Sequence, residues 1–116
     1  GRVVRKTSSI RYKDNVEVLT LETAKTALSL EPVTFTLKSE GDVAIDSRVR
    51  YPGFIAEQAH DSGATTWVVY NQDGEPESFR YSELTVAHNE IIKEQQDRID
   101  SLEAAVQSLL DAQSGA

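Results

Sequence analysis

Two serines and a lysine near the amino terminus are the residues whose types and spacing suit covalent chemistry. Ser8 and Ser9 lie shortly before Lys13, with Arg11 between them. A serine hydroxyl becomes a nucleophile when a base takes its proton, and a neutral lysine can be that base. Because a lysine has an ordinary pKa of about 10.4, it is neutral at pH 7 only where burial or a nearby cation disfavours its charge. Spacing alone does not separate a catalytic pair from ordinary polar residues, and an isolated arm offers little burial.

Two other groups of residues are weaker candidates for a site. Glu57 and Asp61 share a face if their segment is helical, but no neighbouring residues are suited to hold a sugar or a phosphate, so we interpret them as solvated acids. Pro52-Gly53, followed by Phe54, lacks the clustered glycines and the lysine of a phosphate-binding loop.

Metal and thiol chemistry are not indicated. Cysteine is absent, which excludes disulfides, thiol catalysis and cysteine-based zinc sites. The two histidines, His60 and His88, are too few and too scattered in the sequence to predict a metal site, and we interpret His88 as a core or interface residue. We expect no metal and no cofactor.

The net charge of −7 argues against general nucleic-acid binding, because neutralising phosphates needs a basic surface. We also expect no membrane partner and no secretion, since neither a spanning apolar run nor a charged-then-apolar leader is present. The charge is unevenly distributed along the sequence. The first thirteen residues include five basic ones and no acid, whereas the segment from Glu83 onward has seven acids and only two basic residues, Lys93 and Arg98. This asymmetry either draws the amino-terminal arm to an acidic helix of the same or a neighbouring chain, or is ordinary solvated charge.

The segment from Tyr81 to Gln113 has the longest regular pattern in the chain. Two rows of mostly apolar residues recur every seven positions, three residues apart, as in the a/d seam of a coiled coil. Position a holds Ile92, Ile99 and Val106, and position d holds Gln95, Leu102 and Leu109. At about 1.5 Å per residue, this helix would be about 50 Å long, too long for the rest of the chain to cover. We expect the seam to bind other copies of the chain; the alternative is a single amphipathic helix lying on its own domain.

The ends of this helix also have recognisable signals. Ser82 is expected to cap its start and Gly115 to close its end. Glu94 and Arg98 are expected to form an i,i+4 ion pair that stabilises the helix by about 0.3 kcal/mol.

The residues before the helix predict a small α+β domain. Residues 1–13 have no helical period and are expected to form an extended arm. A helix capped by Thr20 should end before Pro32, because the residue before a proline avoids the α region. Its apolar face would consist of Leu21, Ala24, Ala27 and Leu28.

Short elements follow this first helix. A strand is expected over 33–38, a break at Pro52-Gly53, and a short helix that ends at His60 or Asp61. A hairpin should then pair residues 66–70 with residues 78–81 across a polar turn. The fold class is therefore α+β, a small mixed domain with short strands and a long carboxyl-terminal helix that forms a coiled coil.

Four passages occur in a fixed order along the chain. They are Ser8-Ser9-Ile10-Arg11-Tyr12-Lys13, Ala27-Leu28-Ser29-Leu30-Glu31-Pro32-Val33-Thr34-Phe35, Gly53-Phe54-Ile55-Ala56-Glu57-Gln58, and Tyr81-Ser82-Glu83-Leu84 leading into the heptads. Together they resemble the intramolecular chaperone domain at the carboxyl ends of phage tailspikes, endosialidases and tail fibres, also found in myelin regulatory factors. That family's first passage runs serine, usually aspartate, any residue, arginine, an apolar residue, lysine. Ser9 replaces the usual aspartate, and Glu57-Gln58 inverts the family's usual order.

The resemblance implies a homotrimeric folding device that cuts itself free. Three chains would hold their upstream fibre segments in register, and Ser8 would then attack the carbonyl group of Thr7, with Lys13 as base and Arg11 in support. Residues 1–7 would be the end of the fibre, 8–80 the chaperone domain and 81–114 the stalk. The chain would act once and in cis, as a serine-lysine peptidase. It would act in the host cytoplasm during virion assembly and be absent from the mature fibre.

Several alternatives stay open at this point. Ser9 could be the nucleophile, although the five-residue step to Lys13 and the position of Arg11 favour Ser8. Isoleucine or valine at a with leucine at d is more often found in dimers, so the resemblance alone argues for a trimer. The chain could also be a non-catalytic trimerisation cap or interaction module. A hydrolase acting in trans is disfavoured, because the sequence indicates no substrate pocket.

Overall fold

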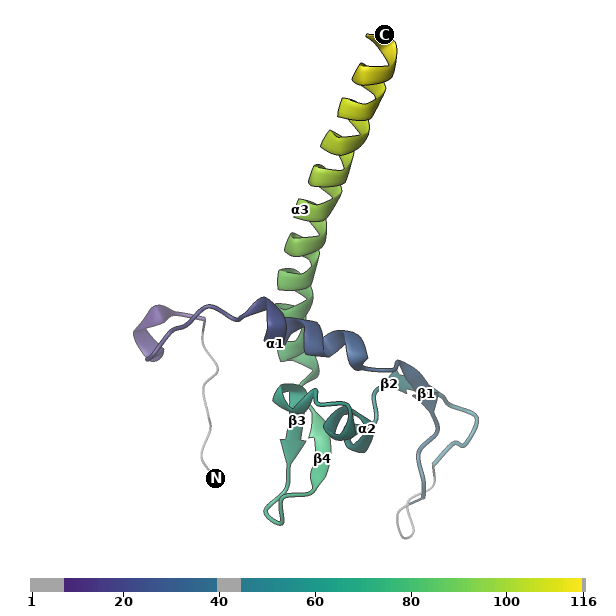
Figure 1. The fold of residues 1–116 in the computed structure, drawn as a ribbon. Coiled ribbons are helices and arrows are strands. Elements are labelled where there is room, and N and C mark those ends of the chain that lie inside the picture. Colours follow the sequence, from purple (N-terminus) through teal and green to yellow (C-terminus); the bar gives the residue numbers. More distant parts are fainter. Residues whose placement is uncertain (1–7, 40–44, 116) are drawn as a thin grey trace.

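The computed structural model describes residues 8–39 and 45–115, and shows a small body from which one long helix projects (Figure 1). The molecule is elongated, with principal extents of 77 × 43 × 24 Å. The body contains short helices and two pairs of strands, which confirms the α+β fold class. Among the described residues, no helix is both long and apolar enough to cross a membrane.

The long helix α3 spans Tyr81–Ser114, as the heptad pattern predicts. Its N-cap is Arg80, and Ser82 lies inside the first turn, where its hydroxyl donates to the Glu83 carboxylate at 2.9 Å. The prediction that Ser82 caps the helix is therefore wrong. At the far end, the Gly115 N–H donates to the Asp111 carbonyl oxygen at 3.0 Å, which confirms Gly115 as the closing residue.

The body is built from short elements. In chain order they are the 3-10 turn Ile10–Tyr12, α1 (Leu21–Lys25), the 3-10 turn Thr26–Ser29, β1 (Val33–Phe35), β2 (Tyr51–Gly53), α2 (Ala56–Asp61), the 3-10 turn Thr65–Trp67, β3 (Val68–Tyr70) and β4 (Pro76–Phe79). In Figure 1, α1 crosses the lower part of α3, and α2 with the β3–β4 pair lies below the start of α3. The arm and the β1–β2 pair project from opposite sides of the body (Figure 1).

The strands form two separate antiparallel pairs. In the first pair, Thr34 lies opposite Pro52, so Pro52-Gly53 belongs to strand β2 and the predicted break there is wrong. A proline is tolerated because both strands of a two-stranded sheet are edges, where a missing N–H need not interrupt a ladder. The second pair confirms the predicted hairpin, although its strands are 68–70 and 76–79 and not 66–70 and 78–81. Its turn is held by the Asn71 side chain, which accepts from the backbone N–H groups of Asp73 and Glu75.

The first helix follows the prediction at its start and departs from it at its end. Thr20 caps α1, with its hydroxyl accepting from the Thr23 N–H at 3.1 Å. From Thr26 onward the backbone is a 3-10 turn with three residues per turn, so the buried face continues through Ala27. Leu28 is turned outward and is 62% exposed. The prediction that Leu28 belongs to the apolar face is wrong for that reason.

The core is small and rich in alanine. The buried hydrophobic residues of the described chain are Ala24, Ala27, Ala56, Ala59, Ala64, Trp67, Val68, Phe79, Leu84, Ala87 and Ile91. Trp67 is the largest of them, and its indole N–H donates to the Thr26 hydroxyl at 3.2 Å. Because alanine buries little surface, the elements approach closely but each contributes little hydrophobic free energy.

Candidate functional site

The predicted catalytic residues flank a 3-10 turn in the arm. Ser9 is the N-cap of the turn Ile10–Tyr12, and Ser8 directly precedes it. Lys13 is the C-cap, and its backbone N–H donates to the Ile10 carbonyl oxygen at 3.2 Å. This turn replaces part of the extended arm that the sequence predicted. The side chains of Ser8 and Lys13 are both exposed, so the described residues of a single chain do not enclose a site around them.

Ser9 and Arg11 are engaged with each other. The Ser9 hydroxyl oxygen accepts from the Arg11 backbone N–H at 3.2 Å and from Arg11 Nε at 3.3 Å. The Arg11 guanidinium carbon also lies 5.5 Å from the centre of the Tyr12 ring. Arg11 therefore holds the turn together through Ser9. Thr7, which carries the carbonyl of the predicted cleavage site, lies outside the described residues.

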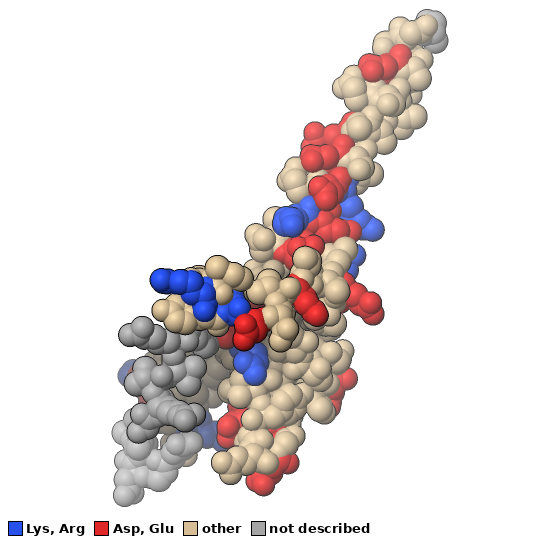
Figure 2. Space-filling view, turned by 90° about the vertical axis from the view of Figure 1, so that its left-hand side faces the viewer, with Lys and Arg blue, Asp and Glu red and all other residues tan. Residues whose placement is uncertain are grey.

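The turn and the segment that follows it expose apolar side chains that sequence reasoning did not single out. Ile10, Tyr12, Val16 and Val18 are all exposed, Val18 to 87%. The chain joins the body at Leu19, which packs against the core. Acidic side chains gather along the stalk with a few basic ones among them, and further basic side chains lie on the arm, which faces the viewer (Figure 2). The near-alternation of apolar residues from Ile10 to Val18 was a signal in the sequence for a segment that needs a partner surface.

Helix α3 presents two different faces. Leu84, Ala87 and Ile91 are buried against its own body. The seam positions, by contrast, are exposed in the single chain; they are Ile92, Gln95, Ile99, Leu102, Val106 and Leu109. Most of the helix extends beyond the body (Figure 1), so the alternative in which it lies along its own domain does not describe this structure. His88 is exposed on the same helix and is not a core residue of its own chain.

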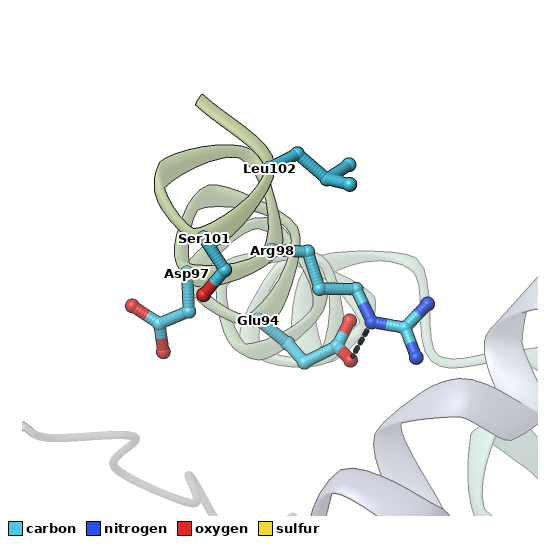
Figure 3. Close-up of a pocket in the computed structure, with 5 residues that line it drawn as sticks. All are labelled: Glu94, Asp97, Arg98, Ser101 and Leu102. Atoms are coloured by element: carbon cyan, nitrogen blue, oxygen red, sulfur yellow. Dashed lines mark ion pairs between the residues drawn. The ribbon is translucent and has the colours of Figure 1, made fainter. Parts of the chain in front are cut away.

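Two shallow hollows lie along the stalk. One is lined by Glu94, Asp97, Arg98, Ser101 and Leu102, and the other by Ile99, Leu102, Glu103, Val106 and Gln107. Figure 3 shows the first, with the ion pair between Arg98 and Glu94, whose Nε and Oε1 atoms are 2.9 Å apart. All residues of each hollow come from one helix, so neither is an enclosed cavity for a small substrate. Both flank the seam.

The acids and histidines elsewhere do not assemble into a site. Glu57 and Asp61 are exposed on α2, and His60 Nδ1 lies 2.7 Å from the Tyr70 hydroxyl. No cluster suited to hold a metal ion occurs among the residues that the structure describes.

An ion pair outside the arm and the stalk, between Asp46 and Arg48, shifts the pKa values of both side chains. The side chain of Arg48 donates to the Asp46 carboxylate and lowers the pKa of that group below its ordinary value. The backbone N–H of Arg48 donates to the same group and lowers its pKa to a smaller extent. The same side-chain hydrogen bond raises the pKa of Arg48. The pair is exposed in the loop before β2 and is not part of the predicted site.

Comparison with protein-family models identifies the domain. The model described as "Chaperone of endosialidase" matches residues 8–67, more than half of the chain. The chain belongs to the chaperone of endosialidase family. A search of curated proteins finds no match.

The first and last residues matched by the chaperone of endosialidase model are both informative. It begins at Ser8, the residue predicted as nucleophile, and ends at Trp67, in the centre of the core. Helix α3 therefore lies outside the match, and its role in association rests on the heptads and on the exposed seam. The family supports a role as an intramolecular chaperone, in agreement with the resemblance seen in the sequence.

Proposed function

We propose that this domain gathers three copies of its own polypeptide through α3, holds their upstream segments in register while these fold as a fibre or tailspike, and is then released by self-cleavage. The observation that carries the proposal is the apolar seam of α3, which is exposed beyond the body: Ile99 is 47% and Leu102 65% exposed. A seam of this regularity is a typical association surface of helices.

A trimeric tether addresses a physical difficulty of fibre folding. Long β-structured trimers fold slowly because their contacts join residues distant in sequence or on different chains. Linking the chains beforehand raises the effective concentration of each strand near its partners. Once the fibre has folded, its high barrier to unfolding maintains it, so the tether can be removed. In this proposal the chaperone acts in the host cytoplasm during virion assembly, as the resemblance to the phage family implies.

Release would proceed through an ester. The Ser8 hydroxyl oxygen attacks the carbonyl carbon of Thr7, while Lys13 accepts the hydroxyl proton and the proton passes to the departing Ser8 nitrogen. The peptide bond is thereby exchanged for an ester between the Thr7 carbonyl and the Ser8 oxygen. Water then hydrolyses the ester and yields a free carboxylate on Thr7 and a free hydroxyl on Ser8. Residues 8–116 leave as one piece.

The exposure of the arm links this chemistry to assembly. A lysine serves as a base in its neutral form, which burial favours. Lys13 is exposed in the single chain, and the apolar side chains of Ile10 and Val16, three residues before and after it in the sequence, are exposed as well. Contact with a neighbouring protomer would cover these apolar groups and remove water from Lys13. Cleavage would then follow association and not precede it.

The contacts of Ser9 favour Ser8 as the nucleophile. The Ser9 oxygen is the capping acceptor for the Arg11 N–H. Serine and aspartate are both preferred capping residues, which gives a physical reason why Ser9 can stand where the family usually has aspartate. Ser8 is left as the serine that directly follows the bond to be cut.

The test uses a chain with a longer natural upstream segment. The intact mass of the wild type should show two products, ending at Thr7 and beginning at Ser8, while Ser8→Ala and Lys13→Ala should remain full length. If all three proteins keep their own full-length masses, no self-cleavage occurs. Cleavage by Ser8→Ala, together with loss of cleavage in Ser9→Ala, would assign the nucleophile to Ser9.

A non-catalytic trimerisation cap is the second candidate, and the exposure of both Ser8 and Lys13 is the observation that favours it. It shares the association through α3 and lacks the chemistry. An uncleaved wild type that is nonetheless trimeric by sedimentation equilibrium would support the cap. A dimeric wild type would contradict the trimer in both candidates.

A further inference from the structure

Two charged residues flank the seam of α3 on opposite sides. With Ile99 at position a and Leu102 at position d, Arg98 is at position g and Glu103 at position e. These are the positions beside a coiled-coil core, where charges select the partner and its orientation. The two hollows of the stalk reflect this arrangement, because Arg98 lines one and Glu103 lines the other.

Both side chains are accessible to a neighbouring helix. Arg98 is 73% exposed beyond its contact with Glu94, and it extends to the same side of the helix as Leu102 (Figure 3). Glu103 is also exposed, and it takes part in none of the ion pairs that the described residues make. A positive and a negative group are thus available on the two edges of the same apolar surface.

We propose that Arg98 of one protomer pairs with Glu103 of the neighbouring protomer and fixes the helices parallel and in register. In a parallel coiled coil, a g residue approaches the e residue five positions later on the adjacent helix, which is the spacing from Arg98 to Glu103. The inference rests on the proposed association of α3. In a closed ring, each helix offers Arg98 to one neighbour and Glu103 to the other, so the pair repeats at every interface.

The equivalent g and e positions one heptad before and one heptad after this pair show why the pair would determine the orientation of the helices. Ile91 at g would approach Gln96 at e, and Ala105 at g would approach Leu110 at e. Neither combination is charged, so the Arg98–Glu103 contact is the one electrostatic signal among these three levels of the stalk. Ile91 is, moreover, already buried against its own body.

Parallel orientation matters for the proposed chaperone because the body lies at one end of α3 (Figure 1). Parallel helices place all bodies, and all arms, at the same end. Antiparallel helices would separate the arms by up to the length of the stalk, about 50 Å for 34 residues. Upstream segments could then not be brought together.

The first experiment is a charge-reversal cycle measured by sedimentation equilibrium. We expect Arg98→Glu and Glu103→Arg each to weaken association at least about tenfold, since every interface of the oligomer then carries like charges. The double variant R98E/E103R should recover most of that loss. Arg98→Glu also removes the bond to Glu94, but E103R cannot restore that bond, so recovery reports the contact between protomers. A double variant no tighter than R98E alone would overturn the pair.

A matched control separates this contact from net charge. Lys93→Glu makes the same charge change and removes the ion pair with Glu90, in which the nitrogen and oxygen atoms are 3.5 Å apart, but position b lies away from the seam. E103R should not rescue K93E. Rescue of K93E as strong as that of R98E would show a nonspecific charge effect and overturn the proposal.

The second experiment reads the orientation directly. The chain has no cysteine, so Gln113→Cys, at position a one heptad after Val106, places a single thiol on the seam near the carboxyl end of each stalk. Parallel helices predict a disulfide-linked pair of chains on mild oxidation, at a concentration where the oligomer is intact. An oligomer without cross-linking would contradict the parallel arrangement while leaving association itself in place. A monomeric wild type would instead contradict the proposed function.

Discussion

The hydroxyl oxygen of Tyr81 accepts a hydrogen bond from the backbone N–H of Phe54 at 3.0 Å. This bond joins the first residue of α3 to the residue that follows β2, and the rings of Phe54 and Tyr81 stack with their centres 6.0 Å apart. The body thereby holds the base of the stalk. Gly53 is part of the same contact, because a Cβ atom on it would lie 2.7 Å from the Tyr81 hydroxyl oxygen.

Removing the Tyr81 hydroxyl should lower the stability of the fold modestly, and it should change the effect of a substitution at Gly53. Tyr81→Phe should destabilise the fold by about 1 kcal/mol, since the Phe54 N–H loses its acceptor. Gly53→Ala should cost about 1–3 kcal/mol through overpacking. In the Tyr81→Phe background, Gly53→Ala should cost less, because the contact with the Tyr81 oxygen is gone and only the one with Phe35 Cε1, at 3.0 Å, remains close. Thermal melting at one protein concentration measures all four proteins, and strictly additive changes would contradict the geometry.

The hydrogen bond of the buried tryptophan gives a second prediction. Thr26→Val retains the shape of the side chain but leaves the Trp67 indole N–H without its acceptor, which should destabilise the fold by about 1–3 kcal/mol. Thr26→Ser retains the hydroxyl and should lose less. Denaturant unfolding followed by tryptophan fluorescence compares the two. A loss in Thr26→Ser with none in Thr26→Val would mean that packing of the methyl group, and not the hydrogen bond, matters here.

Disrupting the seam should abolish assembly and cleavage together. Replacing Ile99 and Leu102 by aspartate puts charges into the proposed interface, but both residues are exposed in the single chain, so the body should stay folded. We expect a monomer by sedimentation equilibrium with an unchanged near-ultraviolet spectrum of Trp67, and no cleavage by intact mass. Ala104→Asp, on the opposite side of the helix, is the control. Cleavage in a demonstrated monomer would separate the chemistry from assembly.

Ser9 offers a prediction about positioning in the arm. Ser9→Asp should cleave at a rate similar to the wild type, because aspartate can also accept from the Arg11 N–H. Ser9→Ala should cleave several-fold more slowly, since loss of a cap costs about 1 kcal/mol of local stability. The time course of intact mass distinguishes the three proteins. Full activity of Ser9→Ala would show that the capped turn does not position Ser8.

The long helix could be predicted from the sequence because its signal is local and repeated over many residues. The cap of α1 at Thr20 and the turn at Asn71 were likewise recognisable, since a side chain there bonds to nearby backbone. The prediction that Ser82 caps α3 was wrong because tertiary packing sets the start of the helix. The ring of Tyr81 packs against the rings of Phe54 and Phe79. That packing brings the helix to begin one residue before the capping signal.

The remaining differences also arise from contacts distant in sequence. Pro52 lies in a strand because β2 pairs with β1 on one side only, so its missing N–H need not interrupt a ladder. Leu28 turns outward because the backbone changes from an α-helix to a 3-10 turn at Thr26. For the site, the order of Ser8, Arg11 and Lys13 pointed to the family that the comparison shows. Their surroundings could not be predicted, since the groups that would enclose them belong to no part of the described single chain.

The two faces of α3 have a mechanical consequence. Leu84, Ala87 and Ile91 fix the rotation of the helix about its own axis relative to the body, and the seam beginning at Ile92 would fix the same rotation relative to the other helices of the proposed trimer. Because one helix carries both faces, the angle between them would set how each body is turned around the three-fold axis of the proposed trimer. Inserting one residue between Ile91 and Ile92 would swing every body by about 100°. In the proposed trimer, the rotation of α3 about its own axis would therefore set the direction in which each arm points.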